Sequence, residues 1–318
     1  MAINVLITSR SFSQVSDEPV KILRENNINY KFKEKPGLME EKDFLEVIDE
    51  FDAIIIGADK INGNVLNSSK RLKLICKHGT GVDNIDIEAA RKNGIIVTNV
   101  PATNSNAVAD FTFGLIIDLL RKISDNIISV RNGEWVKTIG VDIYGKTIGI
   151  IGFGEIGKRV AKRAIGFDMN VLAYDPYLNG SLNSFSHVKF VDMDLLLRSS
   201  DIVTIHVPLN QNTINLIDED ELNKMKKGAF LVNTSRGGIV NESALYEYLK
   251  KGHLAGAALD VLKVEPAPKN NPLLTLENVL ITSHIASYSK EALNAVSMIC
   301  AKNVVKFFSG QSPDFIVA

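Results

Sequence analysis

The sequence predicts an α/β fold built from two doubly wound parallel sheets, and three observations lead to this prediction. Apolar, strand-like runs alternate with helical patterns along the chain, which is typical of a parallel sheet covered by helices on both faces. The 318 residues, 45% of them apolar, are enough for two domains with sizeable cores. Residues 147–163 contain a glycine-rich turn between an apolar strand and a helix, which is typical of a nucleotide-binding sheet.

Residues 1 to about 100 contain the first set of alternating elements. Five strands are predicted at Asn4–Thr8, Tyr30–Lys33, Ala53–Ile56, Leu72–Lys77 and Ile95–Thr98. Helices are predicted between them at Pro19–Glu25, Lys42–Glu50 and Ile87–Lys92. A doubly wound sheet binds its ligands at the carboxyl ends of its strands, so the residues that follow each strand are the first candidates for a site.

Two of these strand ends carry groups that suit an anion. Arg10 follows the first strand, and a glycine-rich loop follows the fourth. Backbone N–H groups in such a loop and cationic side chains both hold anions. The alternative for the two cationic side chains is that they are solvated surface charges. We predict that the substrate is bound by Arg10, Lys77, His78, Gly79, Thr80 and Gly81.

The next stretch joins this sheet to the nucleotide-binding strand. Pro101 leads into a long predicted helix, Ser105–Arg121, and a second helix is predicted at Ser124–Arg131. After a turn comes Trp135, the only tryptophan of the chain. This aromatic side chain is either an interface anchor or part of a core, and the sequence leaves both interpretations open.

The glycine-rich turn has the spacing of a Rossmann-type phosphate loop. Gly152 permits the sharp turn, Gly154 lets a pyrophosphate approach the backbone, and Gly157 lets the helix pack closely on the strand. The helix begins at Glu155, and its first N–H groups are suited to binding phosphate. The next strand ends in Asp175, near the spacing of about twenty residues expected for a carboxylate that binds an adenosine ribose.

The same carboxylate indicates which dinucleotide is bound. Asp175 accepts hydrogen bonds from a free ribose 2′-hydroxyl but repels a 2′-phosphate. The following residues, Pro176–Leu178, supply no Arg or Lys that would reverse this preference. NAD is therefore favoured over NADP as the cofactor.

The rest of the second sheet follows the same alternation. Strands are predicted at Asp201–Val207, Ala229–Asn233, Gly256–Leu259 and Val279–Thr282, a helix at Met193–Arg198, and a loop at Asn179–Ser186. Beyond the ends of these strands lie three candidate catalytic side chains, namely Arg236, Glu265 and His284. Because the carboxyl ends of parallel strands meet at one rim, these three groups are predicted to converge.

Each of the three has a distinct part in moving hydride to or from a 2-hydroxy acid. Arg236 offers a fork of donors to the substrate carboxylate and polarises the neighbouring carbonyl. His284 protonates that carbonyl oxygen as hydride arrives, or removes the hydroxyl proton in the reverse direction. Glu265 orients the imidazole and stabilises its charged form. Taken singly, the alternatives are a solvated arginine, an exposed glutamate and a core histidine.

Composition and charge argue against several other classes of protein. A formal net charge of −1 gives no basic excess for nucleic acid or a lipid surface. No apolar run approaches the roughly eighteen residues of a membrane span and no signal pattern opens the chain, so a soluble cytoplasmic protein is expected. Cys76 and Cys300 are interpreted as buried apolar side chains, and no metal is predicted because the histidines lack zinc-site spacing.

Several motifs at matching spacing cover most of the chain: His78-Gly-Thr-Gly-Val-Asp-Asn-Ile-Asp86, the glycine loop with Tyr174-Asp175-Pro176, Val232-Asn-Thr-Ser-Arg-Gly-Gly-Ile-Val240, Ala257-Ala-Leu-Asp-Val261 with Glu265-Pro266, and His284. On these motifs the chain resembles the D-isomer-specific 2-hydroxyacid dehydrogenase family, and within it the short-type D-3-phosphoglycerate dehydrogenases. The resemblance implies a catalytic trio of Arg236, Glu265 and His284. It also implies cofactor contacts from Thr80, Glu155, Ile156, Asp175, Val207, Thr234, Ser235, Arg236, Asp260 and the segment after His284, including Ala286.

The resemblance also implies an architecture. It predicts a flavodoxin-like substrate domain at residues 1–100 and 286–318, a Rossmann-type NAD-binding domain at residues 101–285, and a homodimer built on the segment that includes Trp135. Because the chain ends at Ala318, no regulatory domain beyond that residue is expected.

The activity that the resemblance implies is NAD-dependent interconversion of 3-phosphoglycerate and 3-phosphohydroxypyruvate, as in serine biosynthesis. Other substrates of the same chemistry stay open, namely glycerate or hydroxypyruvate, glyoxylate, and another D-2-hydroxy acid. A different class also stays open, that of a non-catalytic, NAD(H)-sensing protein like the corepressors that share this fold.

Overall fold

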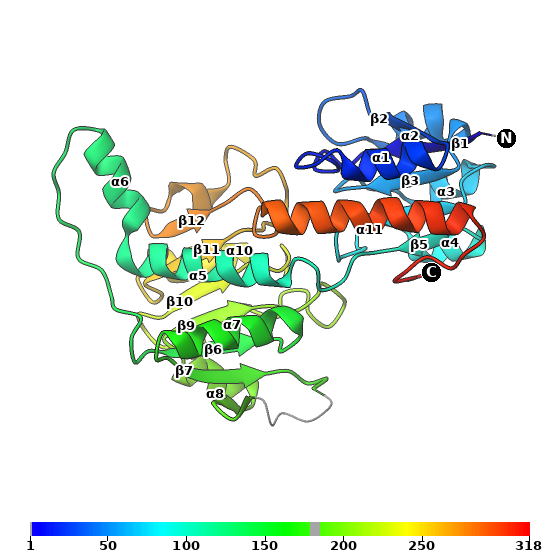
Figure 1. Ribbon diagram of the computed structural model, residues 1–318. Helices are drawn as coiled ribbons and strands as arrows, with labels where there is room; N and C mark the ends of the chain where they lie inside the picture. The colour runs from blue at the N-terminus through cyan, green and yellow to red at the C-terminus, as the bar shows by residue number, and fades with distance from the viewer. Residues whose placement is uncertain (1, 179–184) are drawn as a thin grey trace. The chain divides into compact units, whose positions relative to one another are not determined.

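The computed structural model describes residues 2–178 and 185–318, and these fall into two compact units. The first unit combines Met1–Asn104 with Tyr288–Ala318, and the second is Ser105–Ser287. Figure 1 shows the helices and strands of each unit. Both units have a parallel sheet with helices on its two faces, so the predicted α/β fold with two doubly wound sheets is confirmed.

The first unit is built on a five-stranded parallel sheet in the order β2-β1-β3-β4-β5. Its strands are β1 (Ile3–Ile7), β2 (Ile28–Phe32), β3 (Ala53–Ile56), β4 (Leu74–Lys77) and β5 (Ile96–Thr98). One face is covered by α1 (Glu18–Glu25) and α11 (Lys290–Phe308), the other by α2 (Glu41–Val47), α3 (Gly63–Ser68) and α4 (Ile87–Lys92). This is the flavodoxin-like strand order, in which ligands bind near the carboxyl ends of β1 and β3.

The second unit is built on a seven-stranded parallel sheet in the order β12-β11-β10-β9-β6-β7-β8. Its strands are β6 (Thr147–Ile151), β7 (Asn170–Tyr174), β8 (Val188–Phe190), β9 (Ile202–Ile205), β10 (Phe230–Asn233), β11 (Gly256–Leu259) and β12 (Val279–Ile281). One face is covered by α5 (Ser105–Arg121) and α7 (Glu155–Gly166), the other by α8 (Met193–Ser199), α9 (Glu219–Lys224) and α10 (Glu242–Lys250). The order reverses at β6, which places the nucleotide-binding switch point between β6 and β9.

Helix α7 shows how the local sequence prepares this switch point. Gly154 precedes the helix in an extended conformation, so the chain turns sharply out of β6 before the first helical residue. The buried face carries Gly157, Val160 and Ala164, which are three or four residues apart and therefore lie on one side of the helix. Small side chains at two of these positions let the helix approach the sheet closely.

Predicted and observed boundaries differ by at most three residues where an element was predicted. The strand predicted at Asp201–Val207 is shorter than expected, and β9 ends at Ile205. The helix predicted at Lys42–Glu50 ends at Val47, because that residue leaves the helical conformation with a φ of −124°, and a 3-10 turn follows. Sequence analysis did not predict α3, α9, α10 or β8. The predicted loop Asn179–Ser186 lies largely outside the described residues.

Both cysteines are buried, as predicted. Burial raises the pKa of the Cys76 thiol to about 12, so this side chain is a neutral thiol at physiological pH. Within residues 2–178 and 185–318, no helix is long and apolar enough to cross a lipid bilayer.

Candidate active site

The phosphate loop after β6 admits only glycine at two positions. Gly152 has a φ of +93°, and a Cβ atom there would lie 2.5 Å from the carbonyl oxygen of His206. A Cβ atom on Gly157 would lie 2.1 Å from the carbonyl oxygen of Gly152. Around Gly154, by contrast, a Cβ atom would meet nothing within 4 Å among the described residues. The loop therefore packs tightly against the sheet and leaves open space on the side where a pyrophosphate would lie, so its shape fits a dinucleotide.

Asp175 is placed at the end of β7 as the ribose-binding prediction requires. Its Oδ2 accepts a hydrogen bond from the N–H of Phe153 in the glycine loop at 2.8 Å, and its Oδ1 accepts one from the N–H of Tyr177 at 2.9 Å. Each carboxylate oxygen can accept a further hydrogen bond, so two ribose hydroxyls can still be bound. The carboxylate is thus fixed in orientation before any ligand arrives.

The first residues of α7 contribute backbone rather than side-chain groups. The Glu155 carboxylate forms ion pairs with Arg159 at 2.6 Å and Lys158 at 3.4 Å. The hydrogen bond from Arg159 is the main reason that the pKa of Glu155 is lowered. Because the first N–H groups of a helix have no partner within the helix, those of Glu155 and Ile156 are the groups suited to phosphate.

The imidazole of His284 and the carboxylate of Glu265 form a close pair beyond β11 and β12. Nδ1–H of His284 donates to Oε2 of Glu265 at 2.7 Å, and Oε1 of Glu265 accepts from the N–H of Leu262 at 3.0 Å. The His284 side chain is 45% exposed, so it is not a core histidine. With Nδ1 bound to the carboxylate, Nε2 is the ring atom available to a ligand.

The charge of Arg236 also acts on the Glu265 carboxylate of this pair. Partial burial alone would raise the pKa of Glu265, but the hydrogen bond from His284, the charge of its ring, the Leu262 N–H and the charge of Arg236 together lower it. The carboxylate is therefore ionised at neutral pH. The His284 ring and the Arg236 guanidinium thus both act on the Glu265 carboxylate, while the catalytic roles of the three residues stay a prediction.

The loop that carries His284 is held by a buried carboxylate. Asp260 is 1% exposed, and its two oxygens accept hydrogen bonds from the Thr282 hydroxyl and from the N–H groups of Ile285 and Ala286 at 2.6–2.8 Å. The N–H of His284 donates to the Asp260 carbonyl at 2.9 Å, and the residue adopts a φ of +56°. Asp260 and Ala286, both predicted as cofactor contacts, bind one another here and thereby set the position of His284.

The loop after β10 is held in a similar way. Asn233, which sequence analysis did not identify, is 2% exposed and donates to the Arg236 carbonyl at 2.9 Å while accepting from the N–H and hydroxyl of Ser235. The Thr234 hydroxyl lies 2.9 Å from that of Thr112 on α5. A Cβ atom on Gly237 would lie 2.0 Å from the Leu262 carbonyl oxygen, so the Arg236 loop packs directly on the loop that leads to Glu265.

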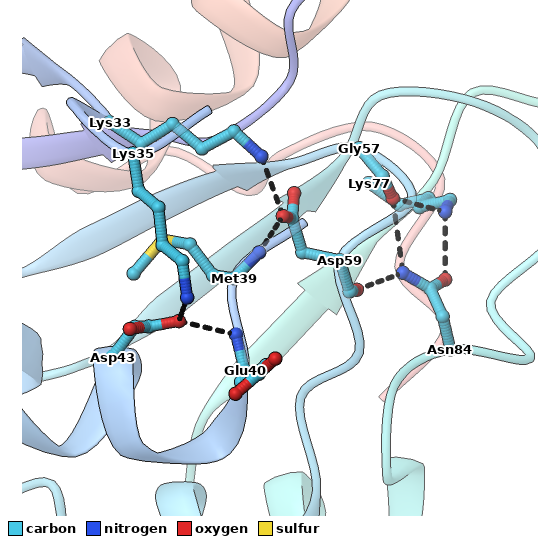
Figure 2. A network of polar contacts seen from close by, with 9 residues as sticks. All are labelled: Lys33, Lys35, Met39, Glu40, Asp43, Gly57, Asp59, Lys77 and Asn84. Atoms are coloured by element: carbon cyan, nitrogen blue, oxygen red, sulfur yellow. Dashed lines mark hydrogen bonds and ion pairs between the residues drawn. The ribbon is translucent and has the colours of Figure 1, made fainter. Parts of the chain in front are cut away.

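In the first unit, the predicted substrate loop after β4 turns its two basic side chains inward. Nζ of Lys77 donates to the Gly57 carbonyl at 2.6 Å and to Oδ1 of Asn84 at 2.7 Å (Figure 2). The His78 ring lies 2.8 Å from the hydroxyl of Ser297 and 3.3 Å from that of Ser11. Burial, together with the charge of Lys77, lowers the pKa of His78 to about 4. Lys77 is therefore not a solvated surface charge, whereas Arg10 is exposed.

The backbone of the same loop presents donors. Gly79 has a φ of +149°, and its carbonyl accepts from the N–H of Val100 at 2.9 Å. The Thr80 hydroxyl donates to the Val100 carbonyl at 3.0 Å. Among the hydrogen bonds of the described residues, none is donated by the N–H of Thr80 or Gly81. Consecutive N–H groups without a protein acceptor form an anion-binding surface.

These observations define a class of protein: a dinucleotide-binding α/β protein with an arginine and a carboxylate-paired histidine at the nucleotide-binding edge of its second sheet. Residues 113–286 match the family model described as D-isomer specific 2-hydroxyacid dehydrogenase, NAD binding domain. The chain belongs to this family, and its cofactor is NAD.

Three similar proteins illustrate the spread within the family. The chain is 42% identical over 299 residues to a D-3-phosphoglycerate dehydrogenase of Archaeoglobus fulgidus, which covers 93% of this chain but only 56% of that protein. It is 39% identical over 283 residues to a glyoxylate reductase of Korarchaeum cryptofilum, covering 87% and 85% of the two chains. The crystal structure of the TT0316 protein from Thermus thermophilus superposes with a TM-score of 0.91 at 32% identity, covering 99% and 100%. The chain thus spans little more than half of the phosphoglycerate dehydrogenase.

Proposed function

We propose that this chain is an NAD-dependent dehydrogenase that interconverts a D-2-hydroxy acid and its 2-oxo acid. The observation that carries the proposal is the 2.7 Å contact between Nδ1 of His284 and Oε2 of Glu265, which leaves Nε2 of a half-exposed ring for a proton transfer. The domain roles follow from this proposal. The second unit binds NAD, and the first unit is the substrate domain.

Each residue of the trio has a task in the direction of reduction. When bound, NADH would supply the hydride for the carbonyl carbon of the 2-oxo acid. The Arg236 guanidinium binds the substrate carboxylate. The protonated ring of His284 gives the Nε2 proton to the carbonyl oxygen, so that the products are the hydroxyl group and a neutral imidazole. Glu265, ionised at neutral pH, stabilises the charged ring before the transfer and keeps it in orientation.

For the substrate, we propose 3-phosphohydroxypyruvate and 3-phosphoglycerate, in serine biosynthesis. The proposal is supported by the exposed Arg10 and by the Thr80 and Gly81 N–H donors, which suit an anionic group, and by the similarity to phosphoglycerate dehydrogenases. Two observations favour a second candidate substrate, glyoxylate or hydroxypyruvate. The Lys77 ammonium is bonded to Gly57 and Asn84. Reductases of these small acids are similar to this chain at comparable identity, over most of their own length.

The test is the initial rate of NADH oxidation by the purified protein with 3-phosphohydroxypyruvate, hydroxypyruvate, glyoxylate and pyruvate. A kcat/KM at least tenfold higher for 3-phosphohydroxypyruvate, which is about 1.4 kcal/mol of transition-state discrimination, supports the phosphorylated substrate. A higher value for an unphosphorylated acid keeps the dehydrogenase and discards that substrate. No turnover with any of them, alongside tight NADH binding, would favour the NAD(H)-sensing alternative.

We also propose that the protein is a homodimer that associates through α6 (Ile123–Arg131) and the segment after it. No residue of α6 is buried, and several large apolar side chains lie exposed on this segment: Ile127, Ile128, Trp135, Val136 and Ile139. Trp135 is 85% exposed, which excludes the core interpretation. An apolar stretch of this extent is typical of a protein interface.

Light scattering tests the dimer. The wild-type protein is expected at twice the chain mass, and the double variant Trp135→Ser/Ile139→Ser at the chain mass of 34.9 kDa. Val15→Ser, which removes an exposed apolar side chain from the first unit, is the control and stays dimeric. A wild-type protein that remains a monomer at micromolar concentration contradicts the proposal.

A further inference from the structure

The two ends of the predicted substrate loop are joined to each other and to one carbonyl group. The loop His78–Asp83 lies between Lys77 and Asn84 in the sequence. Nζ of Lys77 donates to the Gly57 carbonyl at 2.6 Å and to Oδ1 of Asn84 at 2.7 Å. Nδ2 of Asn84 donates to the same Gly57 carbonyl at 3.0 Å and to the Asp59 carbonyl at 2.5 Å (Figure 2). We call Lys77, Asn84 and the Gly57 carbonyl the loop clamp.

The segment that receives these hydrogen bonds is itself fixed. Oδ1 of Asp59, a residue that is 1% exposed, accepts from Nζ of Lys33 and from the N–H of Met39, both at 2.7 Å. The Lys33 side chain is only 7% exposed, so this ion pair is buried (Figure 2). A Cβ atom on Gly57 would lie 3.1 Å from Cα of Ser9, which shows that the segment packs against the end of β1. The clamp therefore pulls the loop ends onto a rigid base.

The clamp uses the hydrogen-bonding capacity of its members economically. The Asn84 amide has two N–H donors and one carbonyl, and all three are used in contacts with Gly57, Asp59 and Lys77. The ammonium of Lys77 directs two of its three N–H donors at neutral oxygen atoms. Between the two ends, the N–H groups of Thr80 and Gly81 donate to no acceptor among the described residues.

We propose that Lys77 and Asn84 are positioning residues, which hold the His78–Asp83 loop in the shape that presents the Thr80 and Gly81 N–H groups to an anionic group of the substrate. Lys77 does not itself contact the substrate. This inference rests on the proposed function, because the loop is assigned to substrate binding there. It differs from a direct charge contact by Lys77, which would act only on a substrate that carries the matching charge.

The kinetic test uses Lys77→Met, Asn84→Ala and the double variant, with glyoxylate and 3-phosphohydroxypyruvate as the two 2-oxo acids. Each single variant is expected to raise KM by about tenfold for both acids, with kcat and the KM for NADH changed less than about threefold. The double variant equals either single one, because both side chains act through the same loop. Lys77→Arg keeps donors for the same oxygen atoms and recovers most of the wild-type KM.

Lys35→Met is the matched control. Lys35 lies in the same region, but its ammonium forms an ion pair with Asp43 at 2.7 Å and touches no member of the clamp (Figure 2). This variant is expected to keep the wild-type KM for both acids. A Lys77→Met effect confined to the phosphorylated acid, with Asn84→Ala equal to wild type, overturns the proposal in favour of a direct charge contact. Additive effects of the two substitutions also overturn it.

Hydrogen exchange of the ligand-free protein separates this proposal from the proposed function, since it needs no turnover. In Lys77→Met and in Asn84→Ala, the amides of Gly79, Ile85 and Val100, which donate to the carbonyls of Lys77, Val82 and Gly79, are expected to exchange at least about fivefold faster than in the wild type and in Lys35→Met. Unchanged exchange in both clamp variants refutes the clamp, even if the enzyme is active. Faster exchange in a protein that reduces no 2-oxo acid keeps the clamp and refutes the dehydrogenase. Should Lys77→Met fail to fold, Asn84→Ala carries the same expectations.

Discussion

Each unit places a histidine just beyond a strand end, yet the two surroundings are opposite. His284, in the second unit, is 45% exposed and hydrogen-bonded to the Glu265 carboxylate. His78, in the first unit, lies between the hydroxyls of Ser11 and Ser297, and burial lowers its pKa to about 4. Ser297 donates its own proton to the Leu293 carbonyl, so it accepts from Nε2–H of His78.

The difference shows what suits a histidine to proton transfer. A ring with a carboxylate on one nitrogen and an accessible second nitrogen can exchange a proton with a ligand, because the carboxylate stabilises its charged form. A ring with both nitrogens bound to hydroxyls has no group that compensates a positive charge, so it stays neutral and joins the loops around it. Position past a strand end is common to both residues and does not distinguish them.

The largest expected effect concerns the second-unit histidine. His284→Ala is expected to lower kcat by roughly a hundredfold or more, because the carbonyl oxygen loses its proton donor. Steady-state kinetics with the preferred 2-oxo acid measure this. His253→Ala is the control. His253 lies before β11, at the edge of the sheet opposite to that of His284, and its ring donates to the Met225 carbonyl. A His284→Ala enzyme with wild-type turnover would remove His284 from the reaction.

The first-unit histidine is expected to show its role in stability rather than in rate. Its folded-state pKa is lowered below the ordinary value, so the unfolded chain takes up the proton first as the pH falls. The contribution of His78 to the free energy of unfolding is therefore complete above about pH 6.5 and is lost progressively towards pH 4. At pH 5 the loss is about 2 kcal/mol.

Urea unfolding at pH 7, 6 and 5 measures this loss. His78→Gln cannot take up a proton, so its stability should fall with pH by about 2 kcal/mol less than that of the wild type over this range. Equal pH dependence of the two proteins would mean that His78 is not held neutral in the fold.

The groups at the rim of the second sheet could be predicted from the sequence. Their positions depend on local spacing and on the order of the strands, not on individual contacts between residues far apart in the chain. Gly152, Gly157 and Asp175 constrain a single strand–turn–helix unit, so their spacing in the chain already expresses the geometry. Arg236 and His284 are far apart in sequence, but parallel strands share one rim, and topology brings them together. Both predictions needed only the order of elements.

The inward-turned side chains of the first unit required contacts that no local pattern encodes. Lys77 finds its carbonyl partner 20 residues earlier in the chain, and His78 finds Ser297 219 residues later, on α11. The sequence predicts an anion site from a lysine and a histidine in a glycine-rich loop, and it gives no sign of these distant partners. Asn84 and Asn233 carry no charge, and the motifs that contain them do not show that each holds a loop by three hydrogen bonds.

Asp175 extends the comparison to a second carboxylate at the rim of the second sheet. Asp175→Ala is expected to weaken NADH binding about tenfold, since hydrogen bonds to a charged group are lost, while NADPH binding weakens less or improves. Fluorescence titration with each nucleotide measures both dissociation constants. Asp194→Ala, which removes an exposed carboxylate that pairs with Arg198 on α8, is the control. An unchanged ratio of the two constants would show that Asp175 does not set the cofactor preference.

The smallest effect concerns the Glu265 carboxylate. It tests whether His284 has a charged partner, in contrast to His78, which contacts two hydroxyl groups. The folded-state pKa of Glu265 is lowered, so its contribution to stability is complete above the ordinary glutamate pKa near 4.3 and is lost as the pH falls through the lowered value. Glu265→Gln keeps a hydrogen-bonding group of the same size but carries no charge. Since the carboxylate is 38% exposed, the free energy of unfolding of the wild type should exceed that of this variant by at most about 1 kcal/mol at pH 6.

The pH dependence of that difference separates the two histidine environments. Between pH 7 and about pH 5 the gap between wild type and Glu265→Gln should not narrow, and it should close only below about pH 4, where the carboxyl group is protonated. The His78 effect, by contrast, develops between about pH 6.5 and pH 4. Urea unfolding of both variants over the same pH series therefore resolves two windows. A Glu265→Gln gap that closes between pH 7 and pH 5 would mean that the carboxylate is not ionised beside His284 at neutral pH, and the proton-transfer pair would have to be reassigned.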